Sequence, residues 1–205
     1  MPDAPHPLLL VHPVLERLAA ELRARPGALA PDDGAPRRAA VAAIFRAAPE
    51  TPLELLLILR AEHEGDPWSG QIALPGGRQE AQDATLQDTA IRETLEETGV
   101  DLSRDGVVLG TLDELRPRTP TLPSIIVTPF VAVVRADAEI SRSEEVAEAF
   151  WAPWSLFGDV LGTQESAVTV RGAEWRVPSY VVGRHVVWGL TERILRQLAE
   201  RVRHA

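Results

Sequence analysis

Three glutamates near the middle of the chain, Glu93, Glu96 and Glu97, have a spacing that brings their carboxylates to one face of an α-helix. No basic residue stands four positions after any of them, so the like charges repel one another. This repulsion is relieved either by solvent on an exposed face or by a divalent cation, since hard cations prefer oxygen ligands. The pattern therefore has two interpretations, a solvated acidic surface and a metal site.

A helix over about residues 84–98 must position these glutamates. Asp83 can cap its N-terminus, and Gly99 is the C-cap glycine expected after its last turn. Ile91 and Leu95 form the apolar stripe of this segment, on the side opposite the carboxylates. The sequence therefore predicts that the glutamates point away from the surface on which the helix packs.

The remaining elements are short strands and two further helices. A helix begins at Pro13, residues 25–37 form a turn-rich linker, and a final helix spans residues 190–202. We expect strands at residues 39–45, 53–59, 107–115, 124–134, 147–151, 167–171 and 175–182. This mixture predicts an α+β fold, with an N-terminal helix and linker over residues 1–37 and a single domain over residues 38–205.

Composition narrows the function classes. The 205 residues include no cysteine, which excludes cysteine-ligated zinc, iron–sulfur clusters and a thiol nucleophile. A net charge of −9 disfavours nucleic acid as a partner, but it allows a phosphate substrate if metal ions reverse the local charge. The apolar run at residues 8–11 is too short for a signal peptide or a membrane span. We therefore expect a cytoplasmic protein without a membrane partner.

The glutamates belong to a longer pattern that resembles the Nudix box, a glycine and an acid followed by Arg-Glu-hydrophobic-x-Glu-Glu-x-Gly. The gap before the arginine is one residue longer than usual and the acid is an aspartate, which resembles the branch that cleaves coenzyme A and acyl-CoA molecules. Residues 56–60, 70–77, 144–146 and 187–191 are similar to other landmarks of that branch. The matching box residues are Gly77, Asp83, Arg92, Glu93, Glu96, Glu97 and Gly99.

This resemblance implies a Nudix α/β/α sandwich with a mixed central sheet, and hydrolysis of a diphosphate by attack of water on phosphorus. It implies Mg²⁺ or Mn²⁺ as the cofactor and a small nucleotide-linked diphosphate as the substrate. Three sets of residues follow from it: the metal ligands Glu93, Glu97, Glu96 and the Gly76 carbonyl; the catalytic residues Glu93, Glu96, Arg92 and Glu145; and the substrate-binding residues Arg60, Arg78, Gly76 and Gly77. Arg92 acts by tying Asp83 back to the helix.

The substrate stays open at this point. Residues 62–66, Glu-His-Glu-Gly-Asp, are acidic where the coenzyme A branch usually has a second basic residue. The contact to the 3′-phosphate of coenzyme A is then absent, or it is made by Arg78, Arg116 or Arg118. The alternatives are a pyrophosphatase for ADP-ribose, NADH or nucleoside triphosphates, a non-catalytic nucleotide sensor, and a structural protein with an acidic helix. The apolar faces of the two terminal helices form either a homodimer surface or part of the core.

Overall fold

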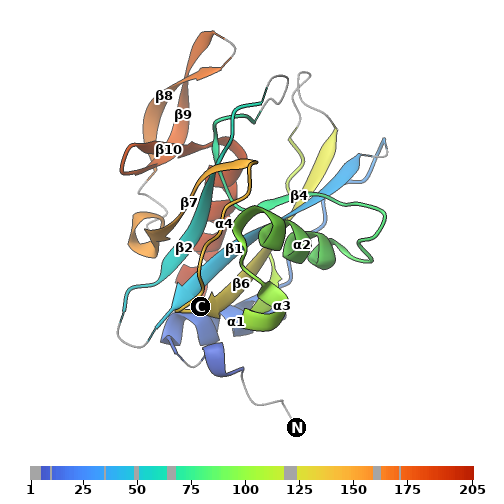
Figure 1. Cartoon of the computed structure of the whole chain (residues 1–205), viewed down its shortest axis with the longest axis vertical. Coiled ribbons are helices and arrows are strands. Elements are labelled where there is room, and N and C mark those ends of the chain that lie inside the picture. Colours follow the sequence, from blue (N-terminus) through green and yellow to red (C-terminus); the bar gives the residue numbers. More distant parts are fainter. Residues whose placement is uncertain are drawn as a thin grey trace.

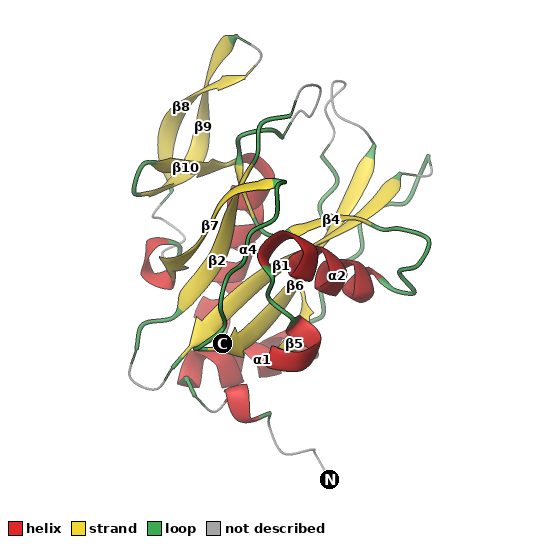
Figure 2. Ribbon diagram, in the orientation of Figure 1, coloured by secondary structure: helices red, strands yellow, loops and turns green. Residues whose placement is uncertain are grey.

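The computed structural model of the chain describes residues 6–9, 11–34, 36–48, 51–63, 68–117, 124–158, 163–170 and 172–205. Helices cover both faces of a large mixed sheet, and a smaller antiparallel sheet projects from one end of it (Figure 1, Figure 2). The predicted α+β sandwich with a mixed central sheet is confirmed. None of the helices in the described ranges has the length and apolar character needed to cross a membrane.

The elements follow one another along the chain with short connections. The helices are η1 (Pro7–Leu9), α1 (Pro13–Ala24), α2 (Leu86–Thr98), α3 (Leu102–Asp105), η2 (Trp154–Leu156) and α4 (Gly189–His204). The strands are β1 (Arg37–Ala47), β2 (Glu54–Arg60), β3 (Ile72–Ala73), β4 (Gly76–Arg78), β5 (Gly106–Thr111), β6 (Ile125–Arg135), β7 (Val146–Pro153), β8 (Gln164–Val170), β9 (Ala173–Val182) and β10 (His185–Trp188).

The large sheet has the order β3-β2-β1-β6-β5, with β7 paired to β2 and β4 paired to β1. Strands β1 and β6 run parallel, and the other pairs are antiparallel. β1 pairs with β2 at Phe45 and Arg46 but with β4 over residues 39–41. Strand β4 therefore takes the edge of β1 that β2 has left, and this divergence opens the sheet where the site lies.

Alternating side chains of β1 fill two layers of core. Ala42 and Ile44 pack on the side of the sheet that α2 covers, whereas Ala43 and Phe45 pack on the side that α1 and α4 cover. Because both faces are covered, β1 and β6 are almost continuously apolar, as expected for buried strands. The apolar faces of the two terminal helices lie in this core, through residues such as Leu15, Leu18, Ile194, Leu195 and Leu198.

Helix α2 differs from the prediction in which face it buries. Leu95 is 45 % exposed, whereas Glu97 is 3 % exposed. The face in contact with the sheet instead carries small side chains, including Ala90, Thr94 and Thr98. The two threonine hydroxyls donate to carbonyls one turn back, at 2.7 Å each, so they are satisfied without solvent. Of the predicted stripe, Ile91 does pack against the core on this side, whereas the prediction for Leu95 was wrong. The prediction that all three glutamates point away from the packing surface was also wrong, because Glu97 is buried.

The start of α2 also differs. Thr85 is the N-cap, and it forms a capping box with Asp88: each side chain bonds the backbone N–H of the other residue. Asp83, the predicted cap, lies two residues earlier and is held by Arg92 instead. The predicted C-cap is confirmed, since Gly99 has a φ of 71° in the left-handed region.

Several strands end at other residues than predicted, and some short elements were not predicted. Strand β5 ends at Thr111 rather than at Leu115, since its register shifts near Gly110 and the chain then leaves the ladder. Leu115 returns to β6 only through an isolated bridge to Val127. Strands β3 and β4 have two and three residues, which is too short to give a periodic signal. The predicted strand over residues 167–171 ends at position 171, which lies outside the described residues.

Candidate active site

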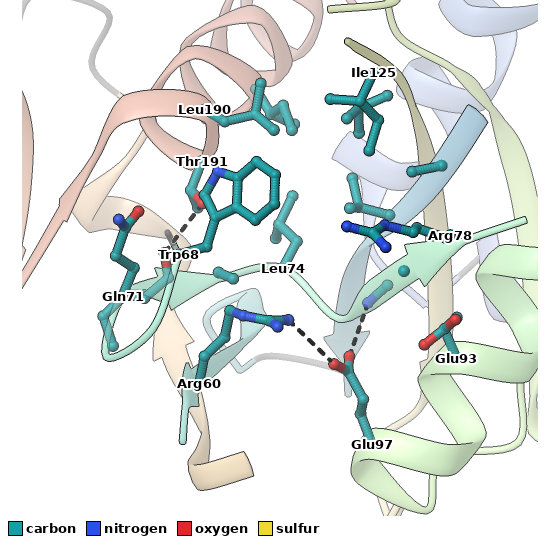
Figure 3. Close-up of a pocket in the computed structure, with 18 of the residues that line it drawn as sticks. Arg60, Trp68, Gln71, Leu74, Arg78, Glu93, Glu97, Ile125, Leu190 and Thr191 are labelled. Carbon is teal, nitrogen blue, oxygen red and sulfur yellow. Dashed lines mark hydrogen bonds and ion pairs between the residues drawn. The ribbon is translucent and has the colours of Figure 1, made fainter. Parts of the chain in front are cut away.

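A cavity of about 590 Å³ lies where β2 separates from β1, between the glycine turn at β4, the C-terminal half of α2 and the first turn of α4 (Figure 3). One end of it is charged and the other is apolar. The charged end contains Arg60, Arg78, Glu93, Glu97 and Glu145. The apolar end includes Trp68, Ile72, Leu74, Ile125, Val127, Leu190 and Ile194.

The two glycines of the turn are required by close approaches. Gly76 has a φ of 148°, and a Cβ there would lie 2.2 Å from the carbonyl oxygen of Ala40 in β1. A Cβ on Gly77 would lie 2.4 Å from the carboxyl carbon of Glu93. Glycine thus allows β4 to lie against β1 while the carboxylate of Glu93 lies directly over the backbone.

Glu97 is the most buried acid of the site. The backbone N–H of Gly76 donates to its Oε2 at 2.8 Å, and Nη1 of Arg60 lies 3.8 Å from its Oε1 (Figure 3). Burial raises the pKa of Glu97 to about 7, although the Gly76 hydrogen bond and the Arg60 charge act against this shift. The nearby carboxylates of Glu93 and Glu145 raise it further. A buried acid among acids is a position that favours a cation.

Glu93 faces the same cavity one turn earlier on α2. Burial also raises the pKa of Glu93, with opposition from the guanidinium of Arg92, whose Nη1 lies 3.0 Å from Oε1. The charges of Glu96 and Glu145 push the pKa of Glu93 in the same direction as burial. The side chain of Glu93 is 15 % exposed, so it is accessible from the cavity but not fully hydrated.

Glu145 reaches the cavity from the loop before β7. The N–H of Ser143 donates to the carbonyl of Glu97, and the N–H of Ala61 donates to the carbonyl of Glu145, at 3.2 and 2.8 Å. The loop is thereby attached to the end of α2 on one side and to the end of β2 on the other. Glu145 itself is exposed, so this anchored loop is solvated where it borders the cavity.

Arg92 lies at the centre of the polar network beside the cavity. It donates to both carboxylate oxygens of Asp83 at 2.9 Å, to Glu96 at 2.9 Å and to the carbonyl of Arg78 at 3.1 Å. Its hydrogen bonds hold the pKa of the Asp83 carboxyl well below its usual range, against the effect of burial. Arg92 and Glu96 are not among the residues that line the cavity, and the Glu96 side chain is 58 % exposed.

The donors suit a hard divalent ion, although their arrangement is not that of a closed ligand cage. Within the described ranges, no three acidic or histidine side chains are gathered tightly enough to enclose an ion. Glu97 is directed at Gly76 and Arg60, and Glu93 is paired with Arg92. Carboxylate oxygens beside a backbone turn are nevertheless the ligands that Mg²⁺ and Mn²⁺ prefer. Of the predicted ligands, Glu93, Glu97 and Gly76 line one cavity and Glu96 lies outside it.

The predicted cationic residues have different positions. Arg60 and Arg78 line the cavity. Arg116 is bonded to Asp33 and to the carbonyl of Pro31 and is not itself among the lining residues, although its neighbour Pro117 is. Arg118 lies outside the described residues.

The apolar end of the cavity was missed by the sequence analysis. Trp68 lies across from Leu190 and Thr191, and the Thr191 hydroxyl donates to the carbonyl of Ile72 at 3.1 Å (Figure 3). These residues come from segments more than a hundred positions apart, so no local pattern joins them. The available signal was a single tryptophan in an otherwise acidic and glycine-rich loop.

Comparison with known proteins identifies the family to which the chain belongs. The family model described as NUDIX domain matches residues 36–170. The Nudix hydrolase NudL of Photorhabdus laumondii is 32 % identical over 152 residues, covering 74 % of this chain and 79 % of that protein. NudL of Yersinia pestis (strain Pestoides F) is 34 % identical over 167 residues, covering 81 % of this chain and 80 % of that protein.

Two solved structures show the same fold at lower identity. The NUDIX domain of Shewanella oneidensis NrtR, complexed with ADP ribose, has a TM-score of 0.53 at 22 % identity, covering 90 % of this chain and 96 % of that one. The MutT protein of Methanosarcina mazei Go1 has a TM-score of 0.54 at 18 % identity, covering 87 % of this chain and 98 % of that one. At these identities the likeness concerns the fold alone. From the family match and the NudL relatives, the chain belongs to the Nudix hydrolase family.

Proposed function

We propose that this protein hydrolyses the diphosphate of coenzyme A or a related nucleotide-linked metabolite, with Mg²⁺ or Mn²⁺ as the cofactor. The observation that carries the proposal is the position of Glu93 and Glu97 beside the Gly76–Gly77 turn in one cavity. Nudix hydrolases generally use divalent metal ions, and the oxygen donors present here fit such an ion.

Glu93, Glu97 and the Gly76 backbone would hold the ion, with Glu96 contributing through water from its exposed position. When bound, the ion supplies charge neutralisation for the diphosphate and lowers the pKa of a coordinated water. The glycine turn leaves room for phosphate oxygens to approach the backbone, and Arg60 and Arg78 add positive charge beside it. Of the predicted catalytic carboxylates, Glu93 and Glu145 line the cavity, and we assign proton transfer from the attacking water to these two rather than to Glu96.

Arg92 has a positioning role in this proposal. Its hydrogen bonds run to Asp83 and to the Arg78 carbonyl, so they connect α2 with the chain that leaves the glycine turn. This connection fixes Glu93 relative to the turn. Arg92 then affects catalysis through geometry rather than through contact with the substrate.

The substrate assignment depends on what recognises the rest of the molecule. Residues 56–60 and 70–77 resemble the coenzyme A branch, and Arg60 and Arg78 are the cations among the described residues that line the cavity. We expect the 3′-phosphate of coenzyme A to contribute little, since Glu62 follows Arg60 closely and Arg116 is engaged elsewhere. ADP-ribose is the second candidate, because the NrtR domain with a similar fold was solved with ADP ribose.

The test is a hydrolysis screen of coenzyme A, dephospho-coenzyme A, ADP-ribose, NADH and nucleoside triphosphates with Mg²⁺ and with Mn²⁺. We expect cleavage between the two phosphates of at least one coenzyme A-type or nucleotide diphosphate compound, and none in EDTA. Cleavage of ADP-ribose alone would move the assignment to the second candidate. Binding without cleavage of any compound would favour a nucleotide sensor and contradict the proposal.

A further inference from the structure

We propose that Arg60 is a built-in counter-cation for Glu97, which competes with the divalent ion and lowers the affinity of the protein for metal. The inference rests on the proposed function, because it concerns the same metal site. It adds a role for Arg60 before any substrate is present. Its basis is the position of one guanidinium against one buried carboxylate.

The fold directs Arg60 toward α2. Side chains alternate along β2, and Leu56 packs in the cluster on the α2 side, so Arg60 faces the same side four residues later. The N–H of Arg60 donates to the carbonyl of Gln71 at 3.1 Å, and the next N–H, from Ala61, donates to Glu145. The backbone is therefore fixed on both sides, and the side chain has a defined direction.

The partner of Arg60 is a carboxylate that solvent does not reach. The side chain of Glu97 is 4 % exposed, that of Arg60 is 27 % exposed, and their nearest charged atoms are 3.8 Å apart. A buried carboxylate is costly unless a charge or hydrogen bonds compensate it. Gly76 supplies one hydrogen bond, and Arg60 supplies the positive charge.

A divalent ion would be drawn to the same place. Glu93, Glu97 and Glu145 line one cavity, and three like charges there attract a cation. An ion on Glu97 and a guanidinium within about 4 Å of the same carboxylate repel each other. Metal binding therefore weakens the Arg60–Glu97 pair, and Arg60 becomes available to the phosphates of a substrate in the same cavity.

The direct test measures Mn²⁺ binding by titration calorimetry, without substrate, for the wild type and three variants. Arg60→Gln removes the charge, Arg60→Lys keeps it, and Arg46→Gln is the matched control. Arg46 pairs with Glu54 at 2.6 Å on the same sheet, outside the cavity lining. We expect Arg60→Gln to bind Mn²⁺ about tenfold more tightly, and the other two variants to stay within about twofold of the wild type.

An unchanged or weaker affinity in Arg60→Gln would overturn the inference while leaving the metal site intact. No Mn²⁺ binding by the wild type would overturn the metal site and this inference with it. Addition of Glu97→Gln supplies a further check, since the effect of Arg60→Gln should disappear in that background.

Thermal melting gives an independent reading. In EDTA, Arg60→Gln should melt below the wild type, because Glu97 loses its counter-charge, and saturating Mn²⁺ should narrow the difference. Arg46→Gln should melt lower by the same amount in both conditions. An Arg60→Gln chain that is unfolded in EDTA and folds with Mn²⁺ would support the inference. A difference from the wild type that Mn²⁺ leaves unchanged would contradict it.

Discussion

Nε and Nη2 of Arg92 donate to the two carboxylate oxygens of Asp83, each at 2.9 Å, although nine positions separate the two residues. The side chain of Asp83 is 3 % exposed and that of Arg92 is 17 % exposed. This bidentate contact connects the loop after β4 to the middle of α2, one residue before Glu93. The position of Glu93 over the glycine turn therefore depends on a pair that need not touch substrate.

The Arg92–Asp83 pair, which we call the brace, predicts losses of stability and activity that are coupled between its two residues. Arg92→Ala and Asp83→Ala should each lower the free energy of unfolding by about 3 kcal/mol, because each leaves a largely buried charge without its partner. Both should also lower kcat. In denaturant unfolding, the double variant should lose less than the sum of the two single losses, by a coupling of about 1 kcal/mol or more. Additive losses in the double-mutant cycle would remove the brace.

The same pair predicts an acid response. Arg92 holds the pKa of Asp83 below its ordinary value of 3.8, so the folded state releases this proton more readily than the unfolded state does. The stabilisation is fully present above pH 3.8 and is lost as the pH falls toward the depressed folded pKa. The free energy of unfolding in urea should therefore fall more steeply below that pH for the wild type than for Asp83→Asn. Parallel profiles would contradict this assignment.

Substitution of the two glycines of the turn should have different effects, one on stability and the other on activity. In Gly76→Ala the added Cβ would lie 2.2 Å from a backbone oxygen of β1, so the sheet must move and stability should fall by several kcal/mol. In Gly77→Ala the obstacle is the Glu93 carboxylate, at 2.4 Å, which can swing away. Gly77→Ala should thus keep most of its melting temperature and lose about tenfold or more in kcat. Equal thermal losses in both variants would show that Glu93 is not what Gly77 accommodates.

Substrate recognition can be tested on one phosphate. We expect coenzyme A and 3′-dephospho-coenzyme A to have kcat/KM values within about tenfold of each other, a difference under about 1.4 kcal/mol. The reason is that Arg60 and Arg78 lie at the charged end of the cavity, where we propose that the diphosphate binds, and Arg116 is bonded to Asp33. A larger preference for coenzyme A would reveal a basic pocket, and Arg78→Ala would then be the next variant.

Local patterns predicted the parts of the site that lie close together in sequence. The resemblance to the Nudix box indicated the glycine turn, Arg92, Glu93 and Glu97, and their short separation in one turn and one helix is why they lie near one another. The buried face of α2 was not predicted, since the sheet packs against Ala90, Thr94 and Thr98 rather than the larger Leu95. Close helix–sheet packing favours small side chains, and hydrophobic periodicity does not register them.

Contacts between segments far apart in the sequence could not be predicted from local patterns. Trp68 and Thr191 line the same cavity, at the place where β3 lies beside β10 and α4 follows β10. The pairing of Arg60 with Glu97 depends on how β2 diverges from β1, which is a property of the whole sheet. Such contacts join segments whose separation in sequence carries no period.

We propose that Glu93 and Glu97 hold the ion on which diphosphate hydrolysis depends. The most direct measurement is steady-state hydrolysis of the best substrate by Glu93→Gln and Glu97→Gln at saturating Mg²⁺ and Mn²⁺, alongside Mn²⁺ affinity. Both variants should stay folded, bind Mn²⁺ more weakly and lose at least about a hundredfold in kcat/KM, comparable to removal of a principal electrostatic group. Near-normal turnover in both folded variants at saturating metal would contradict the claim.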